Sequence, residues 1–185
     1  YRCWTNSSSN VVKTKNVKKV FDLFGKKTIN IARGILNAQG KNSSGELQKS
    51  LGYYLDVKKD AVELRFLGAA YSSVVDKGIR GAKSGAKAPK SPYKYSGQYK
   101  MVNIGAIDKW VVRKGLAAGR NDKGQFVSRK SLVRAIARKI YLYGVAPSNF
   151  FSDALSEGMR TFPKKIAKAY IKDAQEFIRS VTKEM

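Results

Sequence analysis

The chain has 185 residues, of which 43% are apolar, and this length and composition suit one folded domain with a sizeable core. Lysine and arginine total 37 against 13 acidic residues, a net charge of +24 that indicates an acidic protein, a polyanion or an anionic surface as partner. The chain has no histidine and one cysteine, Cys3, which excludes histidine-based triads, an intrachain disulfide and a thiolate zinc site. Because no run of eighteen apolar residues occurs, we expect a soluble protein.

The N-terminal part of the chain predicts a flexible terminus followed by a long helix. Residues 1–10 are rich in serine and asparagine. From about 16 to 38, apolar residues recur three or four positions apart with lysines between them, which predicts an amphipathic helix. The turn-forming residues 40–45 end that helix. Residues 46–52 fit either one helical turn or the entry to a strand.

The next segment predicts a β-hairpin. Residues 53–57 and 61–67 alternate apolar and polar side chains, and 58–60 form the turn between them. The apolar run 69–75 predicts a third strand of the same sheet, with a partly helical conformation as the alternative. Asp60, Glu63 and Arg65 could be taken for part of the carboxylate cluster of a nuclease. Nothing nearby supplies a further carboxylate and a lysine at the spacing of such a metal site, so we interpret the three residues as a solvated strand face.

The segment 77–100 predicts a long basic loop or arm. It has seven lysines or arginines, four glycines, two prolines and no acidic residue, a composition that excludes a regular helix or a central strand. We predict a flexible arm within an inserted basic region of about 77–124, cleaved by proteases until a partner orders it. The spacing of Gly78, Gly81 and Gly85 is not that of a P-loop, so we assign them to the arm.

Lysines and tyrosines are interleaved in this arm, which suits two kinds of partner. The cations and rings can contact phosphates and bases, or they can hold an acidic neighbouring protein. Two further arginines share one helical face four residues apart, although a merely solvated face fits them equally well. The candidate contacts with a partner or DNA are Lys77, Arg80, Lys83, Lys87, Lys90, Tyr93, Lys94, Tyr95, Tyr99, Lys100, Arg134 and Arg138.

Four helices are predicted in the C-terminal half. Helical spacing occurs at 104–111 and again at 128–143, where Gly144 ends the pattern. Ser148 or Asn149 can cap a short helix that runs through Glu157. Pro163 begins a final helix whose predicted apolar face consists of Ile166, Tyr170, Ala174, Phe177 and Val181. We interpret five aromatic residues as core or subunit-interface anchors: Trp110, Tyr141, Tyr143, Phe150 and Phe151.

Together these elements predict an α+β fold with a small antiparallel β-sheet packed on the long N-terminal helix, additional C-terminal helices and a long basic loop or arm. We expect a flexible N-terminus at 1–15 and a single domain at 16–183. Since the sequence supplies no base, nucleophile and metal ligands together, we expect no enzymatic activity and no metal or cofactor.

Several short motifs in a fixed order resemble the tail-completion, neck and minor-tail proteins of tailed bacteriophages. They are the long helix, the glycine-rich turn and hairpin, then Val74-Val75-Asp76-Lys77-Gly78, Gly124 to Leu132, and Pro147-Ser148-Asn149-Phe150-Phe151 before the Pro163 helix. The similarity covers residues 16 to 183. The inserted basic segment 78–124 departs from the compact pattern of that family and leaves open whether the position is in the neck or the tail.

The resemblance implies a structural virion protein without a membrane partner. Such a subunit forms a homo-oligomeric ring between the portal complex and the tail, contacts neighbouring connector and tail proteins, and can touch DNA passing through the channel. It is assembled in the host cytoplasm and resides in the virion neck or tail. The alternative interpretation, from charge alone, is a basic protein that binds nucleic acid without sequence specificity.

Overall fold

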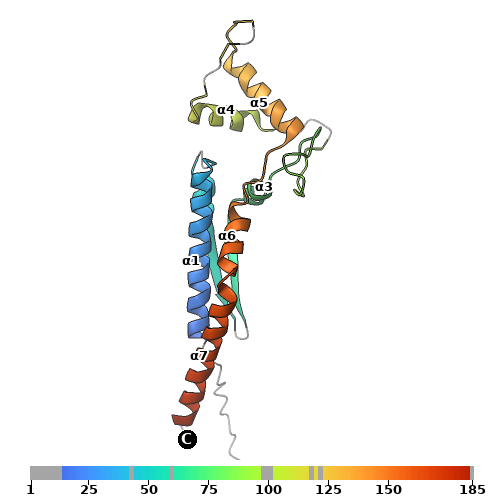
Figure 1. Cartoon of the computed structure of the whole chain (residues 1–185). Coiled ribbons are helices and arrows are strands. Elements are labelled where there is room, and N and C mark those ends of the chain that lie inside the picture. Colours follow the sequence, from blue (N-terminus) through green and yellow to red (C-terminus); the bar gives the residue numbers. More distant parts are fainter. Residues whose placement is uncertain are drawn as a thin grey trace, which may run out of the picture. The chain divides into compact units, whose positions relative to one another are not determined.

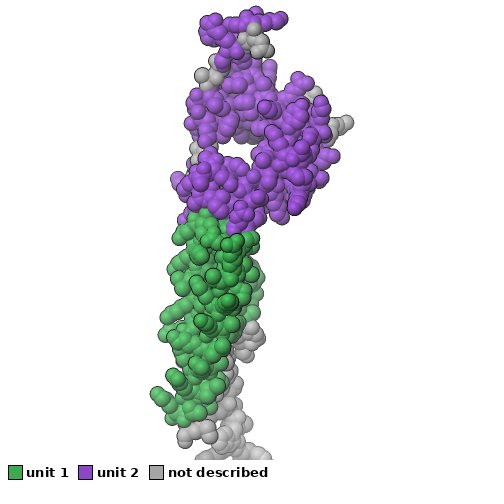
Figure 2. Space-filling view, in the orientation of Figure 1, with its two compact units in different colours: residues 1–31, 52–67, 154–185 green, residues 32–51, 68–153 purple. Residues whose placement is uncertain are grey.

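The computed structural model confirms the α+β prediction (Figure 1). The chain folds as two compact units (Figure 2). The first unit comprises residues 1–31, 52–67 and 154–185, and the second comprises 32–51 and 68–153. The structure describes residues 14–41, 44–58, 61–96, 102–116, 119–120 and 123–183.

The described part of the first unit consists of one hairpin and three helical segments. The strands β1 (Gly52–Val57) and β2 (Val62–Leu67) pair antiparallel, which confirms the predicted hairpin. The predicted third strand is wrong and its partly helical alternative is confirmed, because residues 72–77 form a short helix. The helices that contribute to this unit are α1 (Lys15–Ala38), α6 (Phe150–Met159) and α7 (Phe162–Lys183).

Aromatic rings from the helix, the strand and the C-terminal helix meet in the core of the first unit. Phe24 of α1 lies 6.2 Å from the Phe66 ring of β2 and 4.3 Å from the Phe162 ring of α7. Gly25 allows the sheet to approach α1, because a Cβ atom there would lie 2.7 Å from the Tyr53 ring. The predicted packing of the sheet on the long N-terminal helix is confirmed.

The predicted inward face of α7 is shifted around the helix. Tyr170 is 53% exposed and Ala174 is also exposed, so the prediction that both belong to the buried face is wrong. Ala169 and Asp173 are buried in their place. The physical reason is that the Asp173 carboxylate faces inward to satisfy the backbone at the start of α1.

Asp173 caps α1 from the other end of the chain. Its carboxylate accepts hydrogen bonds from the backbone N–H groups of Asn16 and Val17, each at 2.9 Å, and from Asn16 Nδ2 at 2.7 Å. The first N–H groups of a helix have no partner within the helix, and the helix dipole favours a negative charge at this end. A carboxylate that is 2% exposed is therefore stabilised in its charged form.

Asp173 should make the stability of the protein depend on acid pH. Burial raises the pKa of Asp173, but hydrogen bonds from Val17 and Asn16 outweigh this effect and leave it below its ordinary value of 3.8. Stabilisation by a lowered pKa is present above the unfolded value and is lost as pH falls through the folded one. We expect Asp173→Asn to lower the free energy of unfolding by about 1–2 kcal/mol at pH 7. Urea unfolding at pH 3 should show a smaller difference, and an equal loss at both pH values would contradict this assignment.

Within its described residues, the second unit contains four helices besides the shared ends of α1 and α6. They are α2 (Glu46–Ser50), α3 (Ser72–Lys77), α4 (Ile104–Arg113) and α5 (Arg129–Tyr143). The two alternatives for 46–52 both apply in part, since a helical turn is followed directly by β1. The buried core of the α4 and α5 pair consists of Ile107, Val111, Val133 and Ala137.

The ends of α5 match the prediction. Ser128 caps its N-terminus, because the Ser128 Oγ accepts a hydrogen bond from the Ser131 N–H at 3.2 Å. Gly144 follows its last residue at φ 70°, and its N–H donates to the Ile140 carbonyl. Among the described helices, none is both long enough and apolar enough to cross a membrane.

Residues 78–96, here named the basic loop, are irregular as predicted but do not form a flexible arm. Their backbone N–H groups bond to the C-terminal end of α5, with Ala82 donating to the Tyr141 carbonyl and Lys83 and Ser84 donating to the Leu142 carbonyl. These carbonyls have no partner within a helix, so the loop caps α5. The flexible-arm prediction is therefore wrong for this part of the segment. Residues 97–101 lie outside the described residues.

Candidate partner-binding site

The basic loop is held in place by direct contact between two stretches of backbone. Ile79 and Val145 form an antiparallel bridge in which each N–H donates to the other's carbonyl. A Cβ atom at Gly81 would lie 2.1 Å from the Leu142 carbonyl oxygen, and one at Gly144 would lie 2.1 Å from the Ile79 oxygen. Two of the glycines that the sequence suggested as arm residues, Gly78 and Gly81, therefore serve close backbone approach.

Close in sequence to the Ile79–Val145 bridge, the carboxylate of Asp76 caps α6. It accepts hydrogen bonds from the backbone N–H of Phe151 at 2.8 Å and of Ser152 at 3.3 Å, and from the Ser152 hydroxyl. The Asp76 side chain is 5% exposed. We name residues 75–78 and 147–152 together the α6 junction.

The prediction that Ser148 or Asn149 caps α6 is wrong for Ser148. The Ser148 hydroxyl donates to the Val75 carbonyl at 2.7 Å, so this side chain ties the two segments together. The backbone of Asn149, at φ 52°, donates to the Asp76 carbonyl and accepts from the Asp153 N–H. Sequence reasoning missed Asp76 as the cap, because it lies 76 residues before Ser152.

The end of α1 supports the same junction. Gln39 Nε2 donates to the Ser148 carbonyl at 2.8 Å, and the Lys41 ammonium donates to the Pro147 carbonyl at 3.3 Å. Burial lowers the pKa of Lys41. The α6 junction therefore joins two segments of the second unit and receives hydrogen bonds from a third, the end of α1.

The lysines of the basic loop point to solvent. Lys83, Lys87, Lys90 and Lys94 are exposed, as is Lys77 at the end of α3. Within the part of the chain that the structure describes, the ion pairs involve Lys26, Lys27, Lys58, Arg65 and Arg129, and none involves a lysine of the loop. Among the described residues, the lysines of the loop thus form no ion pair.

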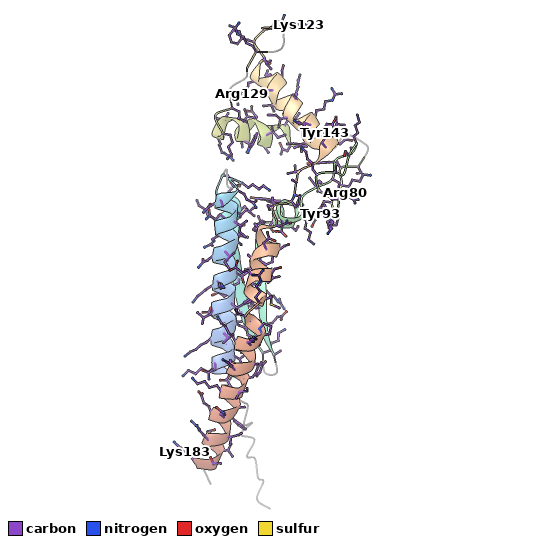
Figure 3. All side chains as sticks on the ribbon, viewed as in Figure 1. Arg80, Tyr93, Lys123, Arg129, Tyr143 and Lys183 are labelled. Atoms are coloured by element: carbon purple, nitrogen blue, oxygen red, sulfur yellow. The ribbon has the colours of Figure 1, made fainter. Side chains whose placement is uncertain are left out.

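Arg80 differs from these lysines because it is partly buried. Its backbone N–H donates to the Tyr93 carbonyl, and its carbonyl accepts from the Tyr95 N–H. Arg80 and Tyr93 are both labelled in Figure 3. The aliphatic part of its side chain lies near Gly85, and its Nε atom is buried and has no hydrogen-bond partner among the residues that the structure describes. Arg80 therefore contributes to the internal structure of the loop as well as to its charge.

The tyrosine side chains of the loop pack partly against the protein, whereas an aromatic platform that stacks on bases needs exposed rings. The Tyr95 ring lies 5.7 Å from the Tyr141 ring of α5, and burial raises the pKa of Tyr95. The Tyr93 hydroxyl donates to the Ser73 hydroxyl at 2.9 Å. Both side chains are half-buried, which disfavours the predicted stacking on bases. Tyr99 and Lys100 lie outside the described residues.

The arginines of α5 occupy two different environments. Arg134 lines a groove of about 580 Å³ between α4 and α5, together with Asp108 and Arg129. Arg129 Nε donates to Asp108 at 2.7 Å, and this hydrogen bond lowers the pKa of Asp108. Arg138 is exposed one helical turn before Tyr141, the residue that contacts the loop. Of the two, Arg138 is the one close in sequence to the loop contacts.

The five predicted anchors divide between core and surface. Phe150 is 1% exposed and belongs to the core, and the half-buried Phe151 ring lies 6.5 Å from it. Tyr141 is half-buried against the loop. Trp110 is 37% exposed and Tyr143 is 39% exposed, so a core role is wrong for both.

The charged residues of the hairpin form a surface ion-pair cluster. Arg65 and Lys58 donate to the Glu63 carboxylate at 2.9–3.1 Å and lower the pKa of Glu63 to about 2. All three side chains are at least 42% exposed, in agreement with the predicted solvated strand face, while Asp60 lies outside the described residues. Among the described residues, no three His, Cys, Asp or Glu side chains gather in a group that could hold a metal ion.

Comparisons of the chain with protein-family models, with curated proteins and with solved structures find no match. What the protein does has therefore to be inferred from its own geometry. Two features stand out in the second unit: a tightly constructed α6 junction and, beside it, a loop with outward-facing lysines.

Proposed function

We propose that the protein is a structural subunit of the head–tail connector or tail of a tailed bacteriophage, where it forms a ring that joins the portal complex to the tail. The observation that supports this proposal is the α6 junction. It brings together Val74 to Gly78 and Pro147 to Phe151, two of the motifs that carry the resemblance to tail-completion and neck proteins. Two segments that each resemble the same family support the proposal more strongly when they contact each other in the structure.

The basic loop suits a role in assembly. Its exposed lysines are fixed on a folded support and form no ion pair among the described residues, so their charge can be balanced by an adjacent acidic subunit. Because the loop is already ordered, binding to such a subunit costs little conformational entropy. The exposed aromatic side chains of Trp110 and Tyr143 can serve as interface anchors between the subunits of the oligomeric ring.

The outward-facing cations also favour a second candidate function, which is sequence-nonspecific binding of nucleic acid. The half-buried state of Tyr93 and Tyr95 removes the stacking contribution, so this binding would be purely electrostatic. This electrostatic binding would be recognised by an affinity of the isolated protein for duplex DNA that falls steeply as the salt concentration rises. An affinity insensitive to sequence and lost by about 200 mM salt would support this alternative.

Replacing Lys83, Lys87, Lys90 and Lys94 with glutamine tests the proposed function. We expect the variant to fold with almost unchanged stability, because exposed charges contribute little to folding. In the phage that encodes the protein, we expect filled heads and separate tails in place of joined particles, counted by electron microscopy. The matched control replaces four exposed lysines outside the loop: Lys15, Lys18, Lys19 and Lys49.

The outcomes separate the two candidate functions. Fully joined, infectious particles assembled from the loop variant would refute an assembly role for the loop. Failure of joining in the loop variant, with normal joining in the control, would support it. If the loop variant still bound the neighbouring ring and lost only its affinity for DNA, the nucleic-acid function would replace the assembly function.

A further inference from the structure

The most exposed large apolar side chain in the described part of the chain is that of Phe126, at 78%. Phe126 lies three residues before α5, and it pairs with Arg120 in an antiparallel bridge. Next to this bridge, the Val127 N–H donates to the Gly119 carbonyl. The Arg120 guanidinium lies 4.5 Å from the centroid of the Phe126 ring. This cation–π contact holds the ring in place while most of its surface faces solvent.

Directly after this ring, the first turns of α5 add cations along the groove between α4 and α5. The groove has a volume of about 580 Å³, and its lining includes Arg129, Lys130 and Arg134. Lys130 and Arg134 are exposed, lie four residues apart on one helical face and form no ion pair among the described residues. Among the described lining residues, Asp108 is the one carboxylate, and Arg129 binds it through two hydrogen bonds. The groove therefore has an excess of positive charge.

The ring and the cations lie close enough together to contact one strand of nucleic acid. Phe126 and Lys130 are four residues apart, so their Cα atoms are separated by at most about 14 Å. A stacked strand advances about 3.4 Å per nucleotide, and this separation corresponds to about four nucleotides or fewer. Sites for single strands combine an aromatic ring that stacks on a base with cations that bind the phosphates. We name Arg120, Phe126, Arg129, Lys130 and Arg134 together the Phe126 site.

We propose that the Phe126 site binds single-stranded nucleic acid, with one base stacked on the Phe126 ring and the adjoining phosphates bound by Lys130 and Arg134. A single strand is favoured over a duplex, because stacking on a protein ring needs a base whose face is not covered by its neighbours. The position of Arg120 also favours a base as the ligand. Its guanidinium covers one face of the ring and leaves the other face open for a flat group.

The Phe126 site differs from the basic loop in position and in chemistry. The loop caps the C-terminal end of α5, whereas the Phe126 site lies at the N-terminal end, where Figure 3 shows Lys123 and Arg129. In the loop, Tyr93 and Tyr95 are half-buried, whereas the Phe126 ring is exposed. Binding at the Phe126 site therefore requires neither the assembly function nor electrostatic binding by the loop, and its test can fail without affecting either.

The test measures binding of the full chain, by fluorescence anisotropy, to labelled oligothymidylate, to labelled oligouridylate and to a DNA duplex of the same length. We expect Phe126→Ala to weaken single-strand binding about tenfold, because one base stack is lost, and to leave the duplex affinity unchanged. Phe126→Trp should keep single-strand binding tight, since it retains an aromatic face. The matched control is Tyr170→Ala, which removes another exposed aromatic side chain and should change neither affinity.

The cations should act through the salt dependence of binding. Lys130→Gln with Arg134→Gln should reduce the slope of log affinity against log salt concentration by about 1.4 for a single strand, whereas Phe126→Ala should leave this slope unchanged. Both effects on oligothymidylate or on oligouridylate would support the proposal, and the strand that binds more tightly identifies DNA or RNA as the ligand.

Two results would overturn the proposal. One is an unchanged single-strand affinity in Phe126→Ala, and the other is an equal loss of affinity for single strand and duplex. If Phe126→Ala kept its single-strand affinity but prevented the joining of phage particles, the exposed ring would belong to a protein interface and not to a nucleic-acid site.

Discussion

Gly144→Ala is expected to lower the free energy of unfolding by on the order of 3 kcal/mol or more. Gly144 lies at φ 70° and ψ −170°, a conformation that is essentially restricted to glycine. A Cβ atom there would also lie 2.1 Å from the Ile79 carbonyl oxygen and 2.6 Å from the Gly81 nitrogen. Since both neighbours are backbone atoms of the basic loop, which is held by the Ile79–Val145 bridge and by hydrogen bonds to the end of α5, they cannot move aside without disrupting these contacts. Urea unfolding of both proteins measures the loss.

Gly115→Ala is the matched control for this change. Gly115 has a similar positive φ of 62°, but no atom lies within 4 Å of the position that its Cβ would take. The free energy of unfolding of this variant should fall by only about 1 kcal/mol, which is the cost of placing an alanine at a positive φ. Equal losses in the two variants would mean that the close approach of the basic loop to the end of α5 contributes nothing.

Asp76→Ala is expected to cost about 3 kcal/mol of stability, because it removes a buried, charged helix cap and leaves three partly buried donors without a partner. The N–H groups of Phe151 and Ser152 and the Ser152 hydroxyl all donate to this carboxylate. The loss should be concentrated at the start of α6, where amide hydrogen exchange of the first turn should become faster.

The control for Asp76 is Asp153→Ala, which removes an acidic side chain from the first turn of α6 itself. Asp153 is exposed, so it interacts with the helix dipole through water and should contribute only about 0.5 kcal/mol. If the two variants unfolded at the same urea concentration, the α6 junction would not be the structural centre that we infer.

The regular elements with strong local patterns could be predicted from the sequence. In α1 and α5 the three-to-four spacing of apolar residues is visible within the segment, and Ser128 and Gly144 mark the ends of α5. The hairpin follows from two alternating runs around a turn. Segment 69–75 was ambiguous, because a run of small and β-branched residues this short fits a strand and a helical turn equally well.

The state of the basic loop could not be predicted from its composition. A segment rich in lysine, glycine and proline does not form a regular helix or a central strand, and the same composition is typical of a disordered arm. The loop is ordered because its N–H groups find acceptors at the end of α5, about 60 residues later in the chain, a partner that no local pattern reveals. The exposure of the lysines followed from their chemistry, whereas the inward packing of Tyr95 on Tyr141 depended on this tertiary contact.

The sequence by itself determined the amphipathic helices, the hairpin and the excess of positive charge, because periodicity and charge are local properties of the chain. The tertiary structure alone decided which polar groups are buried together. Asp173 lies 156 residues from Val17, and Asp76 lies 76 residues from Ser152. In both cases an unpaired helix end must find an acceptor, and the fold supplies one from a distant segment. The same requirement rotated the buried face of α7 toward Asp173 and left Ile171 and Ile178 facing solvent.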